Sequence, residues 1–75
     1  MDQRLDATGL KCPLPVLKAK RALKGLAFGE TLTVLATDPG AVEDFRNFCD
    51  ATGDTLVEQS DDDGVLTFVI RKSAD

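Results

Sequence analysis

The stretch KCPLP at residues 11–15 decides where the first helix of this chain begins. Proline is favoured at the first position of a helix, because its missing N–H would have no partner there, and a further proline is tolerated within the first turn. An amphipathic run follows over residues 16–26. We therefore expect a helix with Pro13 at its first position, Pro15 in its first turn, and Cys12 at or next to the N-cap.

This expected helix start gives the Cys12 thiol a chemical role. Free backbone N–H groups and the positive end of the helix dipole lie close to a side chain in that position, and they lower the pKa of a thiol and favour the nucleophilic thiolate. Lys11, Lys18 and Arg21 add positive charge, and the chain has no histidine that could act as a base. A cysteine that only fills a small apolar space would not need the flanking prolines or the lysine. We therefore expect an exposed Cys12 thiolate.

Periodicity in the rest of the chain predicts the element order β-α-β-α-β-β. Residues 3–7, 31–37, 55–60 and 65–72 have the pattern of strands. A second helix is expected with Asp38 as its N-cap and Pro39 at its first position, and Gly53 is placed to stop it. The Asp-Gly pair that ends residues 61–64 indicates a hairpin turn. Because the strands alternate, one sheet face is covered, and we expect an α+β fold: a two-layer α/β sandwich with both helices on one face.

Length and composition limit the function classes. A chain of 75 residues is expected to form one domain over residues 1–75, too small for a deep pocket around a large cofactor. The net charge of −4 disfavours direct nucleic-acid binding, which depends on neutralising phosphates. The sequence has neither a transmembrane run nor a signal-peptide pattern. We therefore expect a cytoplasmic protein, with no membrane partner, in which both cysteines stay reduced.

Charge and apolar residues on the first predicted helix leave two interpretations open. Basic residues gather over positions 11–24 and acidic ones over positions 38–63. The basic side chains form either a solvated helix face or a surface for an acidic protein partner. The two leucines nearest the cysteine either cover the sheet edge or form an exposed apolar rim where a partner docks. The candidate partner-binding residues are Leu14, Leu17, Lys18, Arg21 and Lys24.

The second cysteine and the acidic run are better explained by packing and by turn formation than by catalysis or metal binding. Cys49 shares an apolar helix face with Phe45 and Phe48, so we expect a packed thiol rather than a reactive one. The acidic run at residues 61–63 lacks the spaced ligands of a calcium loop and fits a solvated turn. Two separated cysteines without histidine fall short of a tetrahedral metal site. We expect no bound metal and no cofactor.

The run LDATGLKCPLP at residues 5–15 resembles the signature of the TusA/SirA-type sulfur carrier family, in which a strand and a short glycine-containing loop lead into Cys-Pro-x-Pro. The resemblance continues through TDPG at residues 37–40, Phe48-Cys49 and IRK at residues 70–72, and so covers almost the whole chain. It implies a mixed four-stranded sheet backed by two helices, and it assigns the activity to the cysteine before the proline, here Cys12. The family commonly has an acidic residue between the two prolines, where this chain has Leu14.

The residues and the resemblance together favour a carrier rather than a self-sufficient enzyme. In this hypothesis Cys12 takes sulfane sulfur from a persulfide donor protein, a cysteine desulfurase or a rhodanese, and relays it to an acceptor protein. The resemblance implies two settings, 2-thiouridine formation in tRNA and the oxidation of reduced sulfur compounds. The alternative is a regulatory or interaction module in which Cys12 senses redox state.

Overall fold

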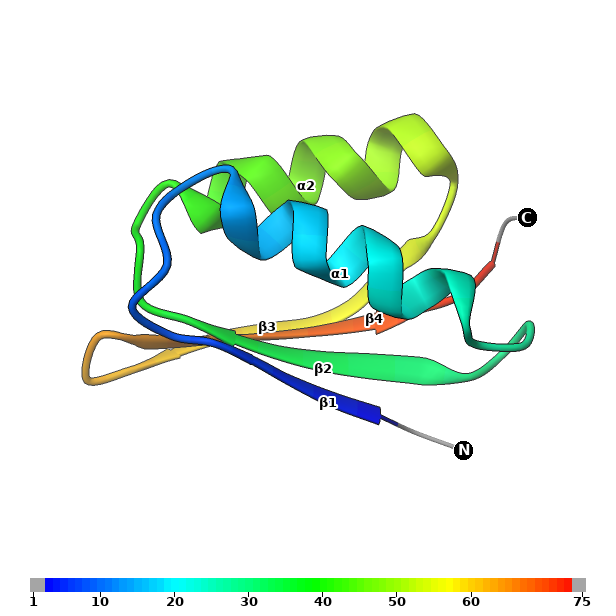
Figure 1. Ribbon diagram of the computed structural model, residues 1–75, viewed down its shortest axis with the longest axis horizontal. Coiled ribbons are helices and arrows are strands. Elements are labelled where there is room, and N and C mark those ends of the chain that lie inside the picture. The colour runs from blue at the N-terminus through cyan, green and yellow to red at the C-terminus, as the bar shows by residue number, and fades with distance from the viewer. Residues whose placement is uncertain (1–2, 74–75) are drawn as a thin grey trace.

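The computed structural model describes residues 3–73, which form a sheet with two helices packed on one of its faces (Figure 1). The element order is β-α-β-α-β-β, as the periodicity predicts. The elements are β1 (Gln3–Ala7), α1 (Leu14–Lys24), β2 (Thr31–Ala36), α2 (Ala41–Thr52), β3 (Thr55–Asp62) and β4 (Val65–Arg71). The expected α+β two-layer sandwich is confirmed.

The four strands form one mixed sheet in the order β1-β2-β4-β3. β1 runs parallel to β2, with Leu5 opposite Val34, while β4 is antiparallel to both of its neighbours. A parallel pair needs a crossover connection, and α1 supplies it. This pairing has a consequence for the site, because the carboxyl ends of β1 and β2 meet at the same edge of the sheet.

The hairpin between β3 and β4 is tighter than the sequence indicates. β3 continues to Asp62, so only Asp63 and Gly64 form the connection, with φ of 54° and 89°. Positive φ at both central residues is the geometry of a type I′ turn, which matches the twist of the flanking strands. Asp61 and Asp62, expected in the turn, belong to the strand instead.

The core lies between the helices and the sheet. Phe45 of α2 stacks on Phe68 of β4 with ring centroids 4.6 Å apart, and both side chains are fully buried. α1 contributes Ala19 and Leu23, together with Pro15, which is also fully buried and is therefore a core residue as well as a helix starter. Cys49 lies among the buried residues, as expected.

Both helices begin later than the prolines indicate. The N-cap of α1 is Pro13 and that of α2 is Gly40, so each helix starts after the residue expected at its first position. α2 ends as expected at Gly53, whose φ of 86° is left-handed and whose N–H donates to the Cys49 carbonyl. Within residues 3–73, neither helix has the length and apolar character needed to cross a membrane.

Candidate functional site

Cys12 lies on the loop between β1 and α1, where its side chain is exposed. Because β1 and β2 are parallel neighbours, this loop lies beside the loop that joins β2 to α2 (Figure 1). Two hydrogen bonds join the loops: the Gly9 N–H donates to Thr37 Oγ1 over 2.9 Å, and the Cys12 N–H donates to Asp38 Oδ2 over 2.7 Å. The position of the thiol is therefore fixed by a segment more than 20 residues further along the chain.

The Asp38 carboxylate connects the two loops. Its second carboxylate oxygen, Oδ1, accepts the Gly40 N–H over 3.0 Å just before α2 begins. The hydrogen bonds from the Cys12 and Gly40 N–H groups hold the pKa of the Asp38 carboxyl below its usual value, with a smaller contribution from the charge of Lys11. Asp38 was expected to be the N-cap of α2, but the N-cap is Gly40, and the Asp38 carboxylate binds the backbone N–H groups of Cys12 and Gly40 instead.

Asp44, in the first turn of α2, is the second carboxylate at the site. Its Oδ2 accepts a hydrogen bond from the Cys12 Sγ. This hydrogen bond, followed by desolvation and by the charges of Asp44 and Asp38, raises the pKa of the Cys12 thiol to about 11. In the free protein Cys12 is therefore a neutral thiol at neutral pH, and the expected lowering of its pKa is wrong.

The start of α1 explains why the helix does not offset these carboxylates. Cys12 lies one residue before the N-cap, and the Cys12–Pro13 peptide bond is cis. Pro13 and Pro15 have no N–H, and the Leu14 N–H donates to the Lys11 carbonyl over 2.9 Å. The donors that a helix N-terminus usually offers an anion are thus largely removed or already bound.

The three residues expected to support Cys12 lie in different surroundings. Lys11 is exposed, and its charge acts on Asp38 rather than directly on the thiol. Pro13 is exposed, and its carbonyl accepts the Leu17 N–H over 3.1 Å. Pro15 is buried and anchors the first turn of α1 in the core.

The five candidate partner-binding residues all lie on the exposed side of α1. Leu14 is 46% and Leu17 is 53% exposed, so neither covers the sheet edge, and the interpretation as an exposed apolar rim fits the structure. The spacing of three and four residues places the five on one helix face that begins beside Cys12. We call this face the α1 stripe; it consists of Leu14, Leu17, Lys18, Arg21 and Lys24, all of them exposed.

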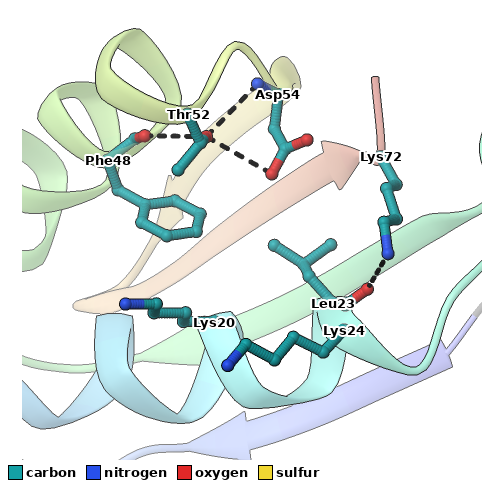
Figure 2. A pocket seen from close by; sticks show the side chains of 7 residues that line it. All are labelled: Lys20, Leu23, Lys24, Phe48, Thr52, Asp54 and Lys72. Atoms are coloured by element: carbon teal, nitrogen blue, oxygen red, sulfur yellow. Dashed lines mark hydrogen bonds between the residues drawn. The ribbon is translucent and has the colours of Figure 1, made fainter. Parts of the chain in front are cut away.

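A shallow cavity of about 110 Å³ lies at the opposite end of the helices (Figure 2). Leu23 and Phe48 provide apolar surface, and Lys72 Nζ donates to the Leu23 carbonyl over 2.9 Å. The remaining lining residues are Lys20, Lys24, Thr52 and Asp54. The cavity does not reach Cys12. An open hollow does flank the cysteine loop, lined by Gly9, Leu10, Lys11, Thr37, Asp38 and Pro39.

The second cysteine and the acidic residues do not form a further reactive centre. Cys49 is buried, and burial is the main cause that raises the pKa of its thiol to about 11. Within the described range 3–73, no three histidine, cysteine or carboxylate side chains are grouped so as to hold a metal ion.

Sequence reasoning singled out Cys12, expected Asp38 only as the N-cap of the second helix, and missed Asp44. Periodicity places Asp44 only on the polar face of the second helix. An available signal was the β-α-β order at the start of the chain, since strands joined through a helix in this way commonly run parallel and bring the beginnings of both helices to one edge of the sheet. An acidic residue in the first turn of the second helix then lies within reach of a residue just before the first.

Known proteins resemble this chain over nearly its whole length. The family model described as "Sulfurtransferase TusA" matches residues 3–72. A putative sulfur carrier protein of Neisseria meningitidis serogroup A is 55% identical over 69 residues, which cover 92% of this chain and 93% of the relative. The sulfur carrier protein TusA of Allochromatium vinosum is 50% identical over 72 residues, 96% of this chain and 95% of the relative.

A solved structure agrees with the fold. The crystal structure of a SirA-like protein from Desulfitobacterium hafniense superposes with a TM-score of 0.84 at 30% identity, covering 95% of this chain and 97% of that one. The family match spans all six elements, including the Cys-Pro-Leu-Pro junction and both aspartates that contact Cys12. By sequence and by fold, this chain belongs to the TusA sulfurtransferase family.

Proposed function

We propose that this chain is a sulfur carrier that accepts sulfane sulfur as a persulfide on Cys12 and passes it to a cysteine of an acceptor protein. The observation that carries the proposal is the exposed Cys12 thiol, presented on a loop at the beginning of α1. Membership of the TusA family and full-length relatives that are named sulfur carrier proteins support it. The other cysteine is buried, which favours Cys12 as the point of attachment.

The transfer is a thiol–disulfide type of exchange that needs no outside oxidant. The Cys12 sulfur attacks the outer sulfur of the donor's persulfide and forms a new S–S bond. The donor's S–S bond breaks, and its electron pair stays on the donor cysteine sulfur, which is thereby reduced. Cys12 has then gained one sulfur atom, and the same exchange delivers that atom to the acceptor cysteine.

The α1 stripe is the proposed contact surface for these partners. Its leucines lie nearest Cys12, and its cations continue along the helix, so one surface joins an apolar patch to positive charge. A partner with an acidic surface around an apolar contact complements both parts. The proposed donor is a cysteine desulfurase or a rhodanese, and the proposed setting is the cytoplasm, where free thiols stay reduced.

The acceptor determines which of two processes the carrier serves. One is the formation of 2-thiouridine in tRNA, and the other is the oxidation of reduced sulfur compounds. In both, the carrier meets proteins rather than the nucleic acid, which suits a chain with a net charge of −4.

The test is sulfur loading followed by intact mass. The protein is incubated with a cysteine desulfurase and cysteine, and we expect a gain of one sulfur atom that a reductant removes. Cys12→Ser should show no gain, whereas Cys49→Ser should load like the wild type. Equal loading of wild type and Cys12→Ser would contradict the proposal.

The redox-sensor alternative has weaker support. Sensor cysteines combine exposure with a low pKa and often have a resolving cysteine nearby. Cys12 is exposed, but its pKa is raised, and Cys49 is buried. If mild peroxide adds oxygen to Cys12 while a desulfurase adds no sulfur, the sensor is the better assignment.

A further inference from the structure

Two carboxylates of one neighbouring segment contact the reactive loop, one at the sulfur and one at the backbone. Asp44 accepts the hydrogen bond of the thiol, and Asp38 accepts that of the Cys12 N–H. Asp38 is held in place by a second N–H, that of Gly40. Lys11 lies on the cysteine loop, and its positive charge helps to lower the pKa of Asp38.

This arrangement is the reverse of what an attacking sulfur needs. A nearby anion that accepts a hydrogen bond from the neutral form of an acid stabilises that form and opposes ionisation. The thiolate, not the thiol, is the nucleophile. Asp44 therefore keeps the free carrier in its unreactive form, and reaction requires that this carboxylate be neutralised or drawn away.

We propose that Asp44 controls the proton of Cys12, and that the sulfur donor must bring a positively charged side chain against Asp44 to release the nucleophile. This deepens the proposed function and rests on it for the identity of the donor. When a donor Lys or Arg pairs with Asp44, the sulfur loses its hydrogen-bond acceptor and attacks the donor persulfide. The proton of Cys12 passes to the donor cysteine sulfur, which leaves with the electron pair of the broken S–S bond.

The same carboxylates act on the loaded form. The terminal sulfur of a persulfide is more acidic than a thiol and is anionic near neutral pH. Repulsion from Asp44 and Asp38 raises the free energy of this anion. Asp44 thus opposes storage of the sulfur and favours its transfer to an acceptor, so that an Asp44→Asn variant should hold sulfur longer than the wild type.

The first test is the pH dependence of Cys12 alkylation by iodoacetamide, with the modified cysteine identified by peptide mass. Asp44→Asn keeps the shape of the side chain and removes the charge. We expect its alkylation midpoint to lie at least one pH unit below that of the wild type, so that the rate at pH 8 rises about tenfold. Asp44→Glu, which keeps a carboxylate, should retain a high midpoint.

Glu43→Gln is the matched control. Glu43 is exposed in the same first turn of α2, and its substitution removes one charge without changing the contact with Cys12. The pH dependence of Cys12 alkylation in Glu43→Gln should match that of the wild type. A wild-type midpoint at or below that of free cysteine, or equal profiles for Asp44→Asn and Glu43→Gln, would overturn the role of Asp44.

The second test measures the charge that the site favours in a reacting partner. Two methanethiosulfonate reagents are compared, one with a trimethylammonium group and one with a sulfonate group. The wild type should react faster with the trimethylammonium reagent than with the sulfonate reagent. Asp44→Asn should lower the ratio of these two rate constants severalfold more than Glu43→Gln does. Equal narrowing by both variants would overturn the requirement for a cation at Asp44.

Both tests use small reagents, so they are independent of sulfur loading. If the desulfurase fails to load Cys12 while the alkylation profiles differ as expected, the carrier function is wrong and the control by Asp44 stands. If loading succeeds while the profiles coincide, the carrier function stands and Asp44 has no such role.

Discussion

Asp38 and Asp44 change the chemistry that the Cys12 motif implies on its own. The cysteine, the prolines and the lysine are neighbours in sequence, and each could be interpreted from local rules. The carboxylates come from a segment that the sheet brings alongside, and they reverse the direction of the thiol pKa. At the residue scale the exposure of the Cys12 thiol was thus predictable, whereas its protonation state was not, because that depends on a contact between distant parts of the chain.

Asp38 should also make the stability of the protein depend on pH. Its pKa is lower in the folded protein than in the unfolded chain. Its contribution is therefore fully present above the usual aspartate pKa and is lost as the pH falls through the lowered value. We expect Asp38→Ala to be less stable than the wild type at neutral pH and the difference to shrink on acidification.

Urea unfolding of both proteins, at a series of pH values between about 7 and 3, measures this difference. Glu43→Gln serves as the control, because its carboxylate lies one position from Asp44 and outside the network of Asp38 hydrogen bonds. A stability difference for Asp38→Ala that stays constant over this range would show that its carboxylate has no such role.

The two helices were predictable in type and approximate length, but their first residues were not. Prolines mark a helix start only to within a residue or so, since they are compatible with the N-cap as well as with the first turn. The burial of Pro15 and the exposure of Leu14 and Leu17 depend on how α1 lies on the sheet, which the 3.6-residue period does not define to within one residue.

The ends of the helices provide a matched pair of glycine substitutions. Gly53 follows α2 in the left-handed region, where a side chain costs roughly 1–2 kcal/mol. Gly25 follows α1 with a right-handed φ of −87°, which alanine adopts without strain. We expect Gly53→Ala to lower the free energy of unfolding by about 1 kcal/mol or more, and Gly25→Ala to leave it unchanged or raise it slightly. If urea unfolding shows that both variants lose the same free energy of unfolding, this interpretation of the end of α2 is contradicted.

The charge of the α1 stripe is a property of the whole helix face. Arg21→Glu should weaken capture of an acidic donor protein severalfold at low salt and less at high salt, because salt screens exposed charges. Arg46→Glu makes the same change in charge on α2, away from the stripe, and should have little effect. Binding measured over a range of salt concentrations tests this, and identical behaviour of the two variants would mean that the stripe is only a solvated surface.

At the scale of the whole molecule, a small core holds the loop that carries Cys12 at one edge of the sheet. The fold class followed from the element order and the alternation of the strands. The strand order and the parallel pairing of β1 with β2 did not follow from periodicity, because periodicity defines which face of a strand is buried and not which strand lies beside it. The family resemblance supplied the mixed sheet, and the structure shows its register.

The stacked Phe45 and Phe68 join the two layers, so their loss should affect the entire fold. Phe45→Ala removes a fully buried ring and should cost about 3–5 kcal/mol, a large part of the roughly 5–15 kcal/mol that stabilises a typical domain. We expect a cooperative loss of stability in urea unfolding, with a much larger unfolded fraction than in the wild type. Phe28→Ala, at an exposed ring, is the control and should cost far less.

The irregularity between Leu56 and Glu58 affects how copies of this molecule meet in concentrated solution. β3 is an outer strand of the sheet, and such a strand offers unpaired backbone groups on which a further chain can add and begin a fibre. Here the pairing register with β4 shifts at the exposed Val57, an irregularity of the kind that bends a strand, and the strand carries Glu58, Asp61 and Asp62 along its length. A second copy that paired with this edge strand would have to match its irregular backbone and bring like charges together. We therefore expect fibre growth from β3 to be suppressed.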